Sequence, residues 1–304
     1  MTDPDGPPGP TALAHPVVDL HDRVLRWYDE HARDLPWRQP SATAWSVMVS
    51  EFMLQQTPVA RVLPVHEAWL DRWPSPADLA PEPAGEAVRA WGRLGYPRRA
   101  LRLHAAAGAI VRDHGGVVPA DYDALRALPG VGDYTAAAVA VFAHGRRHAV
   151  LDTNVRRVHA RVLDGVAHPP ASVTRGERVR AEQLLPADDA DAATWSVAVM
   201  ELGALVCTSA RPRCADCPVA GRCAWRAAGH PAYDGPPRRG QAWAGTDRQC
   251  RGRLLGVVRD AHAAVPAARL VEAWSDETQR ERCLASLVDD GLLVPVEGNA
   301  YALP

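Results

Sequence analysis

The chain has 304 residues, which allows one large domain or two to three ordinary ones, and it is 47% hydrophobic, so it can bury a sizeable core. All 34 basic residues are arginine, which excludes any mechanism that needs a lysine amine, including a lysine Schiff base. The formal net charge is −2, but residues 90–161 carry 11 Arg against five Asp and no Glu. This basic segment, and a second over 202–246, could bind phosphate or could form solvated helix faces.

The sequence contains no signal for a membrane or for secretion. No apolar run approaches the roughly 18 residues of a membrane span. The N-terminal residues lack the basic and apolar regions of a secretory signal, so we expect a cytoplasmic protein. Residues 1–16 are rich in Pro, Gly and Asp, a composition typical of a disordered tail.

From Val17 to residue 225 the apolar residues recur at intervals of three and four, which is the period of an amphipathic helix. Short loops that contain Pro or Gly separate these segments, and no alternating pattern typical of strands occurs among them. We therefore predict an all-helical region. Its first helix starts at Val17, and further helices are expected near 44–56, 59–72, 85–93, 98–113, 121–128, 133–144, 153–163, 175–185 and 191–206.

The C-terminal part differs in kind. After a Pro- and Gly-rich linker over 226–246, the pattern predicts a small α/β module over 247–304 with a winged-helix outline. Three helices are expected near 248–260, 266–274 and 276–290, followed by a hairpin over 292–303 that turns at 297–299. Because the module carries net negative charge, we expect it to pack or to dock a partner rather than to read DNA.

Glu51 is the first candidate for chemistry. On a helix its neighbours at three and four residues are Val47, Met48, Leu54 and Gln55. A carboxylate in such company is desolvated, which favours its protonated form and makes Glu51 a candidate general acid. The alternative is an exposed and inert Glu at a helix edge.

The segment Leu128-Pro-Gly-Val-Gly-Asp133 connects two predicted helices. Its two glycines permit a tight turn, after which backbone N–H groups at the start of the second helix can bind one phosphate. This is the pattern of a helix–hairpin–helix, and Gly130, Val131 and Gly132 are its candidate DNA-binding residues. An ordinary corner between helices is the alternative.

Asp152 follows the apolar pair Ala149-Val150 and precedes a helical pattern, in Leu151-Asp-Thr-Asn-Val-Arg-Arg-Val158. It could cap that helix. Alternatively, its carboxylate faces a cleft and forms with Glu51 the carboxylate pair that glycosidic cleavage uses.

Four of the six cysteines fall within 17 residues, spaced C-x6-C-x2-C-x5-C: Cys207, Cys214, Cys217 and Cys223. Four thiolates on one short loop can chelate a soft metal centre, and a reducing cytosol makes disulfides a poor alternative. Structural zinc sites usually pair two short C-x2–4-C clips, whereas this loop has only one, so the spacing favours an iron–sulfur cluster over zinc. Cys250 and Cys283 are expected to be ordinary buried thiols.

The first gap of the cysteine loop holds Arg211 and Arg213. A metal centre that fixes this loop would hold both side chains at defined positions. Such an arrangement suits phosphate contacts better than electron transfer.

These motifs occur in the order found in the helix–hairpin–helix DNA glycosylase superfamily, which the sequence resembles over about 17–225. Within it, Ser50–Thr57 and Gly95-Tyr96 most resemble the MutY-type adenine DNA glycosylases. The resemblance implies a mainly α, two-lobed fold with a six-helix barrel over 38–150. The other lobe would join 17–37 to 151–225 and carry a [4Fe–4S] cluster, and we expect a monomer.

The resemblance also implies a reaction. The substrate would be adenine mispaired with 8-oxoguanine or guanine in duplex DNA, flipped out of the base stack. Glu51 would protonate the adenine ring, and Asp152 would stabilise the oxocarbenium-like sugar. Tyr134 and Asn154 would orient the Asp152 carboxylate.

Five further residues resemble those that contact the mispair in this family. Arg33, Trp37 and Leu54 look like residues of the base pocket, although plain core packing is the alternative for Trp37 and Leu54. Gln56 and Tyr96 look like the residues that wedge the duplex beside 8-oxoguanine.

Two alternatives to this function stay open. An endonuclease III-like enzyme would act on another base, but Tyr134 stands where that relative has its lysine nucleophile. A non-catalytic iron–sulfur protein could bind DNA without needing Glu51 and Asp152. The sequence departs from longer members of the family in one respect: 247–304 is too short for their Nudix-related domain, which reads 8-oxoguanine.

Overall fold

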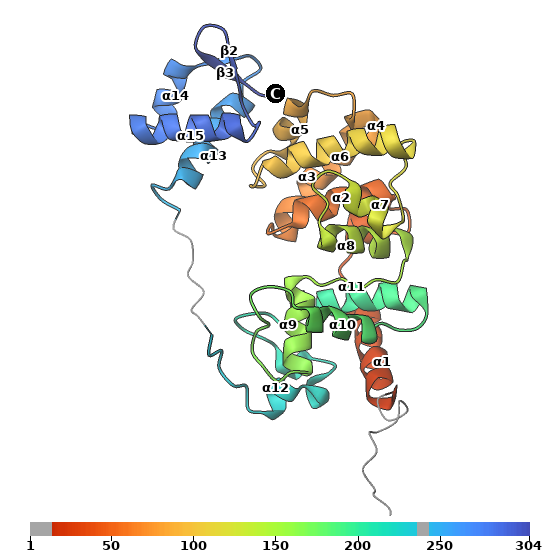
Figure 1. Ribbon diagram of the computed structural model, residues 1–304. Helices are drawn as coiled ribbons and strands as arrows, with labels where there is room; N and C mark the ends of the chain where they lie inside the picture. The colour runs from red at the N-terminus through yellow and green to blue at the C-terminus, as the bar shows by residue number, and fades with distance from the viewer. Residues whose placement is uncertain (1–13, 236–242) are drawn as a thin grey trace, which may run out of the picture. The chain divides into compact units, whose positions relative to one another are not determined.

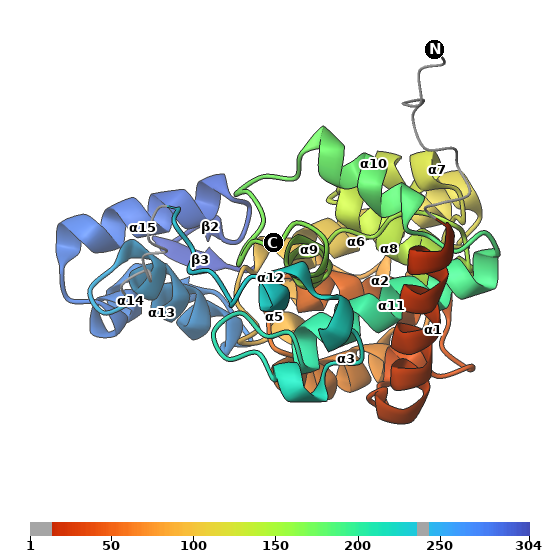
Figure 2. The same ribbon diagram turned by 90° about the horizontal axis from the view of Figure 1, so that it is seen from below.

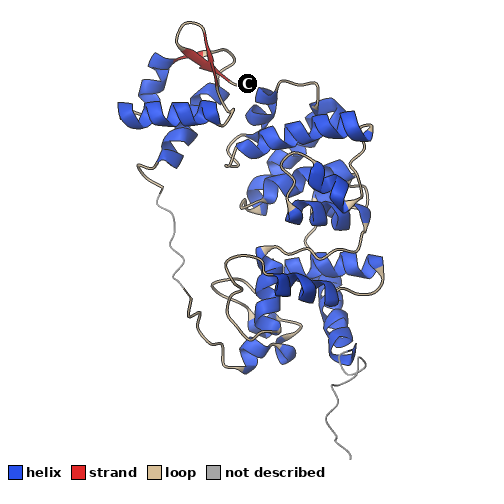
Figure 3. Cartoon of the chain, in the orientation of Figure 1, coloured by secondary structure: helices blue, strands red, loops and turns tan. Residues whose placement is uncertain are grey.

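The computed structural model describes residues 14–235 and 243–304, and most of them are helical (Figures 1 and 3). The chain divides into two compact units. One unit holds the described residues up to Leu35 and those from Ala140 to the linker. The other holds Pro36–Val139 together with the described residues after the linker, so the C-terminal module shares a unit with the barrel segment.

The first unit is built on three helices that surround one apolar core. α11 packs against both α1 and α9. Trp195, Val199, Leu202 and Val206, which the sequence places on one stripe, are all buried in this core. The helices and 3-10 turns of this unit are α1 (Ala14–His31), α9 (Thr153–Val162), α10 (Arg175–Gln183), α11 (Asp189–Leu205), η3 (Cys214–Asp216), η4 (Ala220–Arg222) and α12 (Ala224–Ala227).

The second unit contains the predicted barrel helices. Its core includes a cluster of tryptophans: the Trp69 ring lies edge-on to Trp73 and to Trp91, at centroid distances of 4.8 and 5.9 Å. Its elements are η2 (Pro36–Arg38), α2 (Ala44–Leu54), α3 (Val59–Arg72), α4 (Pro76–Leu79), α5 (Ala84–Trp91), α6 (Arg98–His114) and α7 (Tyr122–Ala127), followed by α8 (Asp133–His144), within which the boundary between the units falls.

The C-terminal module consists of three helices and a small antiparallel sheet, which Figure 2 shows from below. The predicted hairpin is confirmed, with β2 (Val294–Val296) paired to β3 (Ala300–Ala302). A two-residue strand, β1 (Val265–Pro266), adds a third member that the sequence did not predict, because two residues carry no periodicity. The helices are α13 (Asp247–Arg259), α14 (Ala267–Ala273) and α15 (Glu277–Asp289).

The basic segment 90–161 does not serve as one continuous phosphate surface. Arg99, Arg156, Arg157 and Arg161 are buried and donate hydrogen bonds to oxygens inside the fold. The number of arginines in a segment does not show which guanidinium groups reach solvent, because an arginine with enough carbonyl partners can be buried. The remaining arginines of this segment are at least partly exposed.

The start of the first helix differs from the prediction. α1 begins at Ala14, inside the predicted tail over 1–16, and the rest of that tail lies outside the described residues. Residues 236–242 of the predicted linker also lie outside them. Among the described residues, no helix is long and apolar enough to cross a membrane.

Candidate active site

Glu51 lies in the last two turns of α2, and only 4% of it is exposed. Thr43 caps the helix by accepting a hydrogen bond from the Ser46 N–H, and every residue from Trp45 to Met53 is buried. The predicted apolar surroundings of Glu51 are therefore confirmed. A carboxylic acid in such a low-dielectric site is suited to proton transfer.

Within the second unit, α2 meets the helix that follows the hairpin. Gln55 donates a hydrogen bond from its Nε2 to the hydroxyl of the buried Thr135, at 3.3 Å. Tyr134, the predicted orienting residue, precedes Thr135 in the first turn of α8 and is half-buried. The contact fixes the C-terminal end of α2, which carries Glu51, against the start of α8.

The hairpin between α7 and α8 turns tightly at Gly130, whose φ is +76°. A Cβ at this position would lie 2.5 Å from the Cβ of Arg102, so a larger residue would not fit. Gly130 and Gly132 are exposed, as phosphate binding requires. Val131 differs from the prediction, since its side chain is buried and its N–H donates to the Leu128 carbonyl within the turn.

Asp152 caps α9 in the first unit. Its Oδ1 accepts hydrogen bonds from the backbone N–H groups of Asn154 and Val155, at 2.9 and 2.7 Å. Its Oδ2 accepts one from the side chain of Asn154 at 2.6 Å, which supports the predicted orienting role of Asn154. Burial raises the pKa of Asp152 above its usual range, although these hydrogen bonds and the charge of Arg157 oppose the shift. The N-cap interpretation of Asp152 is confirmed, and its pairing with Glu51 across a cleft stays a prediction.

Arg157 connects this carboxylate to the cysteine loop. Its Nη2 donates to Asn154 Oδ1 at 2.8 Å and to the Gly203 carbonyl at 2.7 Å, and its Nε donates to the Cys207 carbonyl at 2.7 Å. α11 approaches so closely here that a Cβ on Gly203 would lie 2.7 Å from the Cβ of Asn154. Asn154 is therefore held from two sides.

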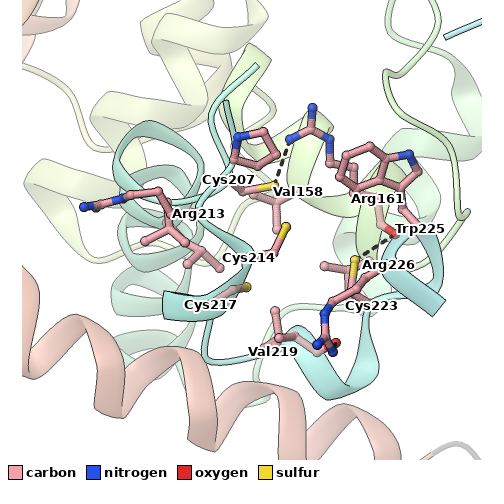
Figure 4. Close-up of a pocket in the computed structure, with 15 residues that line it drawn as sticks. Val158, Arg161, Cys207, Arg213, Cys214, Cys217, Val219, Cys223, Trp225 and Arg226 are labelled. Carbon is pink, nitrogen blue, oxygen red and sulfur yellow. Dashed lines mark hydrogen bonds between the residues drawn. The ribbon is translucent and has the colours of Figure 1, made fainter. Parts of the chain in front are cut away.

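The four predicted ligand cysteines line one pocket of the first unit (Figure 4). The two 3-10 turns η3 and η4 fold the loop back, so that all four thiols surround the same space. The remaining wall is mostly apolar and includes Val158, Val162, Leu202, Val206 and Val219. Cys250 and Cys283 are buried free thiols in the module, as expected.

Arg161 is the principal cation of this pocket and is only 2% exposed. It donates from Nη1 to Cys207 Sγ at 3.4 Å, and its guanidinium lies 4.5 Å from the Trp225 ring centroid. Burial raises the pKa of the Cys217 thiol to about 11, so a metal ion must displace the thiol proton in order to bind the thiolate. Four soft donors beside a buried cation, in an apolar wall, fit a negatively charged metal–sulfur group.

Arg33, predicted in the base pocket, is bound to α11. Its Nε and Nη2 donate to Glu201 Oε1 and Oε2, each at 2.7 Å, and its backbone N–H also donates to Oε1. Glu201 is completely buried, so this two-pronged pair compensates its charge. The pair holds the segment that follows α1 against α11.

Of the other two predicted pocket residues, Trp37 packs inside the second unit. It is buried, and its ring lies edge-on to His66 at 4.9 Å. Leu54 ends α2 and is half-buried. The packing alternative for Trp37 is therefore supported by its contacts.

Gln56 and Tyr96, the predicted wedge residues, are exposed and bonded to each other: the Tyr96 hydroxyl donates to Gln56 Oε1 at 2.9 Å. Both have left-handed backbones, with φ of 56° and 48°, which is costly for residues other than glycine. The buried Arg99 holds both segments, since it donates to the carbonyls of Gln55 at 2.6 Å and Gly95 at 3.0 Å. Burial lowers the pKa of Arg99 to about 10.

Arg211 and Arg213 lie on the cysteine loop, as predicted, and both are exposed. Arg213 turns back toward the loop, because its Nη2 donates to the Leu205 carbonyl at 2.9 Å and its Nε lies 3.7 Å from Asp216 Oδ2. The backbone of Arg211 is held by Thr208, whose hydroxyl donates to its carbonyl at 2.7 Å.

Sequence reasoning missed Glu201, Arg99, Arg157 and Arg161. Glu201 carried a usable signal, because it is a lone acid within an apolar stretch of helix, as Glu51 is. The three arginines carried none, since counting charges treats every arginine as a surface residue.

The comparisons with known proteins agree with this geometry. Residues 49–176 match the model of the family described as HhH-GPD superfamily base excision DNA repair protein. The adenine DNA glycosylase of Mycobacterium tuberculosis (strain ATCC 25618 / H37Rv) is 52% identical over 282 residues, which cover 92% of each chain. That of Mycolicibacterium smegmatis is 52% identical over 281 residues, covering 92% of this chain and 94% of its own.

A solved thermostable thymine-DNA glycosylase has the same fold, with a TM-score of 0.64 and 25% identity over 71% of this chain and 99% of its own. It leaves more than a quarter of this chain unmatched, whereas the mycobacterial relatives cover most of it. The chain therefore belongs to the adenine DNA glycosylases, within the HhH-GPD superfamily of base excision DNA repair proteins.

Proposed function

We propose that the chain hydrolyses the N-glycosidic bond of adenine mispaired with 8-oxoguanine or guanine in duplex DNA. The observation that carries the proposal is the buried Glu51, together with an Asp152 carboxylate held by Asn154 and two backbone amides. Hydrolysis of an N-glycoside needs both a proton donor to the leaving base and an anion beside the developing sugar cation. The two residues match those two needs.

Glu51 is the proton donor in this proposal. Its burial in α2 excludes bulk water from the proton that it transfers. Protonation of the adenine ring turns a poor leaving group into a neutral base.

Asp152 is the carboxylate that stabilises the oxocarbenium-like sugar. Its hydrogen bonds restrict the carboxylate to one orientation, so little reorganisation is needed when positive charge develops. We propose that Tyr134 also orients it. Water completes the reaction, and no lysine is available for a Schiff base that would cut the strand.

The hairpin supplies affinity rather than chemistry. Gly130 and Gly132 are exposed at the start of α8, where the positive end of the helix favours a phosphate. Gln56 and Tyr96 enter the duplex beside the base opposite adenine, and the unpairing that results lets the adenine flip out. The protein acts as a monomer.

Cys207, Cys214, Cys217 and Cys223 hold a [4Fe–4S] cluster in this proposal. The described residues contain no group of three or more His, Cys, Asp or Glu side chains close enough for one metal ion, although the four thiols line one pocket. Zinc would need four donors within about 2.3 Å of one point. A cluster of several irons suits donors that surround a larger space, and when bound it would fix the loop that carries Arg211 and Arg213.

The activity is tested on a labelled duplex with one adenine opposite 8-oxoguanine, followed by hot alkali. We expect a break at the adenine only after alkali treatment. A duplex with cytosine opposite 8-oxoguanine is the control and should stay intact. No alkali-labile site at the adenine, or cleavage before alkali, would overturn the proposal.

The cluster is tested by absorption and by iron and sulfide analysis of the purified protein. We expect a brown protein whose colour is lost in Cys214→Ser and kept in Cys250→Ser and Cys283→Ser, the matched controls outside the pocket. A colourless protein with one zinc and full activity would overturn the assignment.

A further inference from the structure

We propose that the C-terminal module and the edge of the barrel together bind the sugar-phosphate backbone of duplex DNA, beside the Gln56–Tyr96 pair. The site is a groove of about 900 Å³ within the second unit. Arg61, Arg93 and Pro97 line it on the barrel side, and Arg253 and Glu272 line it on the module side. We call it the arginine groove. The inference rests on the proposed function, because it takes the ligand to be the DNA substrate.

The two walls of the arginine groove are fastened by an exchange of arginines. Arg259 of α13 donates from Nη1 to the Gly92 carbonyl at 2.7 Å. In return, Arg89 of α5 donates from Nη1 to the carbonyls of Ala261, at 2.8 Å, and Arg259. Arg259 is buried, so these hydrogen bonds lie inside a packed interface between the module and α5. This interface gives the groove beside it a defined shape.

A second contact fastens the end of the module to α5. The Gly85 N–H donates to the Pro304 carbonyl at 2.7 Å. A Cβ on Gly85 would lie 2.6 Å from that oxygen, so only glycine permits the approach. The C-terminal module is therefore attached to α5 and its C-cap at two separate points.

The charge of the groove favours an anion. Among the described residues, Arg61, Arg93 and Arg253 form no ion pair with a carboxylate. Other arginines of the module are neutralised: Arg251 pairs with Asp290 and Arg282 with Asp247. The acids that line the groove are Asp260, which Arg259 already binds at 2.9 Å, and Glu272.

The position of the groove favours DNA over other polyanions. Gly95 and Pro97, the neighbours of Tyr96 in the sequence, both line it. A duplex that Tyr96 enters must carry its backbone past Arg93, because the phosphates lie on the outside of the base stack. Trp243, also in the lining, is 53% exposed and has the Arg248 guanidinium 5.1 Å from its ring centroid. The negative net charge of the module is thus no obstacle, since the groove as a whole is lined by four arginines, Arg61, Arg93, Arg253 and Arg259, and by two acids, Asp260 and Glu272.

The test compares Arg93→Ala/Arg253→Ala with Arg269→Ala, which removes an arginine of α14 outside the groove lining. Binding is measured on an uncleavable duplex, with 2′-fluoro-deoxyadenosine opposite 8-oxoguanine, as a function of salt. The slope of log K against log salt should fall by about 0.9 for each phosphate that the double variant no longer binds, and the control should keep the wild-type slope. Hydroxyl-radical footprints should show weaker protection beside the mispair.

A double variant with the wild-type slope and footprint would overturn the inference, and so would an equal reduction of the slope in Arg269→Ala. Circular dichroism of each variant checks that it is folded. Failure of the proposed function is distinguishable, because it would show as absent excision by the wild-type protein. The reduction should also be the same for an unmodified duplex, since phosphate contacts carry no sequence information.

Discussion

The Nε of Arg157 donates a hydrogen bond to the backbone oxygen of Cys207 at 2.7 Å, and through this contact the first cysteine of the loop is joined to the hydrogen bonds around Asp152. The same guanidinium binds Asn154 Oδ1, and Asn154 binds Asp152 Oδ2. Three consecutive hydrogen bonds thus connect Asp152 to the cysteine loop. The position of that loop and the orientation of Asp152 are properties of one network.

Arg157→Lys should lower excision strongly while leaving DNA binding nearly unchanged. A lysine keeps the charge but cannot reproduce the fork that reaches Asn154, Gly203 and Cys207 together. Each buried carbonyl left without a donor costs about 1–3 kcal/mol, so thermal stability should fall as well. Single-turnover kinetics and thermal unfolding measure the two effects. Unchanged kinetics in a destabilised variant would mean that Arg157 supports the fold alone.

Glu51→Gln should bind the mispair but lose excision by about 10²–10⁴-fold, the usual contribution of a positioned acid. The amide keeps the shape of the carboxyl group in its buried site but has no proton to give. The measurement is single-turnover excision beside a binding titration on the same duplex. Near-native excision by this variant would remove Glu51 from the mechanism.

Asp152→Asn should also be crippled, and its stability should depend on pH in a defined direction. Burial raises the pKa of Asp152 in the folded protein, so the native state binds that proton more tightly than the unfolded chain does. The charged Asp152 carboxylate therefore lowers the free energy of unfolding at pH values above its raised pKa. It has no such effect at pH values below the ordinary Asp pKa of about 3.9. The free energy of unfolding of the variant, relative to wild type, should increase as pH rises through this range. Parallel pH curves would contradict the shift.

His159 should make the first unit sensitive to acid. Burial, and next the charge of Arg180, lower the pKa of His159 to about 4, so its ring stays neutral in the folded protein. Below its ordinary pKa of about 6.5 the unfolded chain binds a proton that the native state does not. Its contribution to stability is thus complete above pH 6.5 and is lost as the pH falls toward 4, at up to about 1.4 kcal/mol per pH unit. His159→Phe should flatten this part of the stability curve in denaturant titrations; an unchanged slope would contradict the assignment.

The helices were predictable because long amphipathic segments repeat their pattern several times. The bounds of α3 and α8 coincide with the predicted ones, and the other long helices differ by at most a few residues. α4 and α12, with four residues each, complete about one turn and have no period to detect. The short strand β1 was not predicted for the same reason.

For the candidate site, what could be predicted depended on how far apart in the sequence the interacting residues lie. The surroundings of Glu51 and the loop of four cysteines were predictable, because both are encoded within a few neighbouring residues. Arg157, Arg99 and Glu201 act across 46, 44 and 168 positions of sequence, and local patterns contain no information on such pairs. Arg33 illustrates the result: its partner Glu201 lies on a helix far along the chain, and only the structure connects them.

The Tyr96 hydroxyl is hydrogen-bonded to Gln56, and the buried guanidinium of Arg99 holds both segments. If these two residues enter the duplex as proposed, this arrangement lowers the entropic cost of DNA recognition. Two left-handed residues on separate loops would ordinarily sample many conformations, and ordering them on a duplex would weaken binding. Here the Arg99 guanidinium donates hydrogen bonds to six oxygens, and these bonds restrict that freedom while the chain folds. The encounter with DNA then needs little further ordering on the protein side, and the conformational cost falls mainly on the duplex, which must unstack at the mispair.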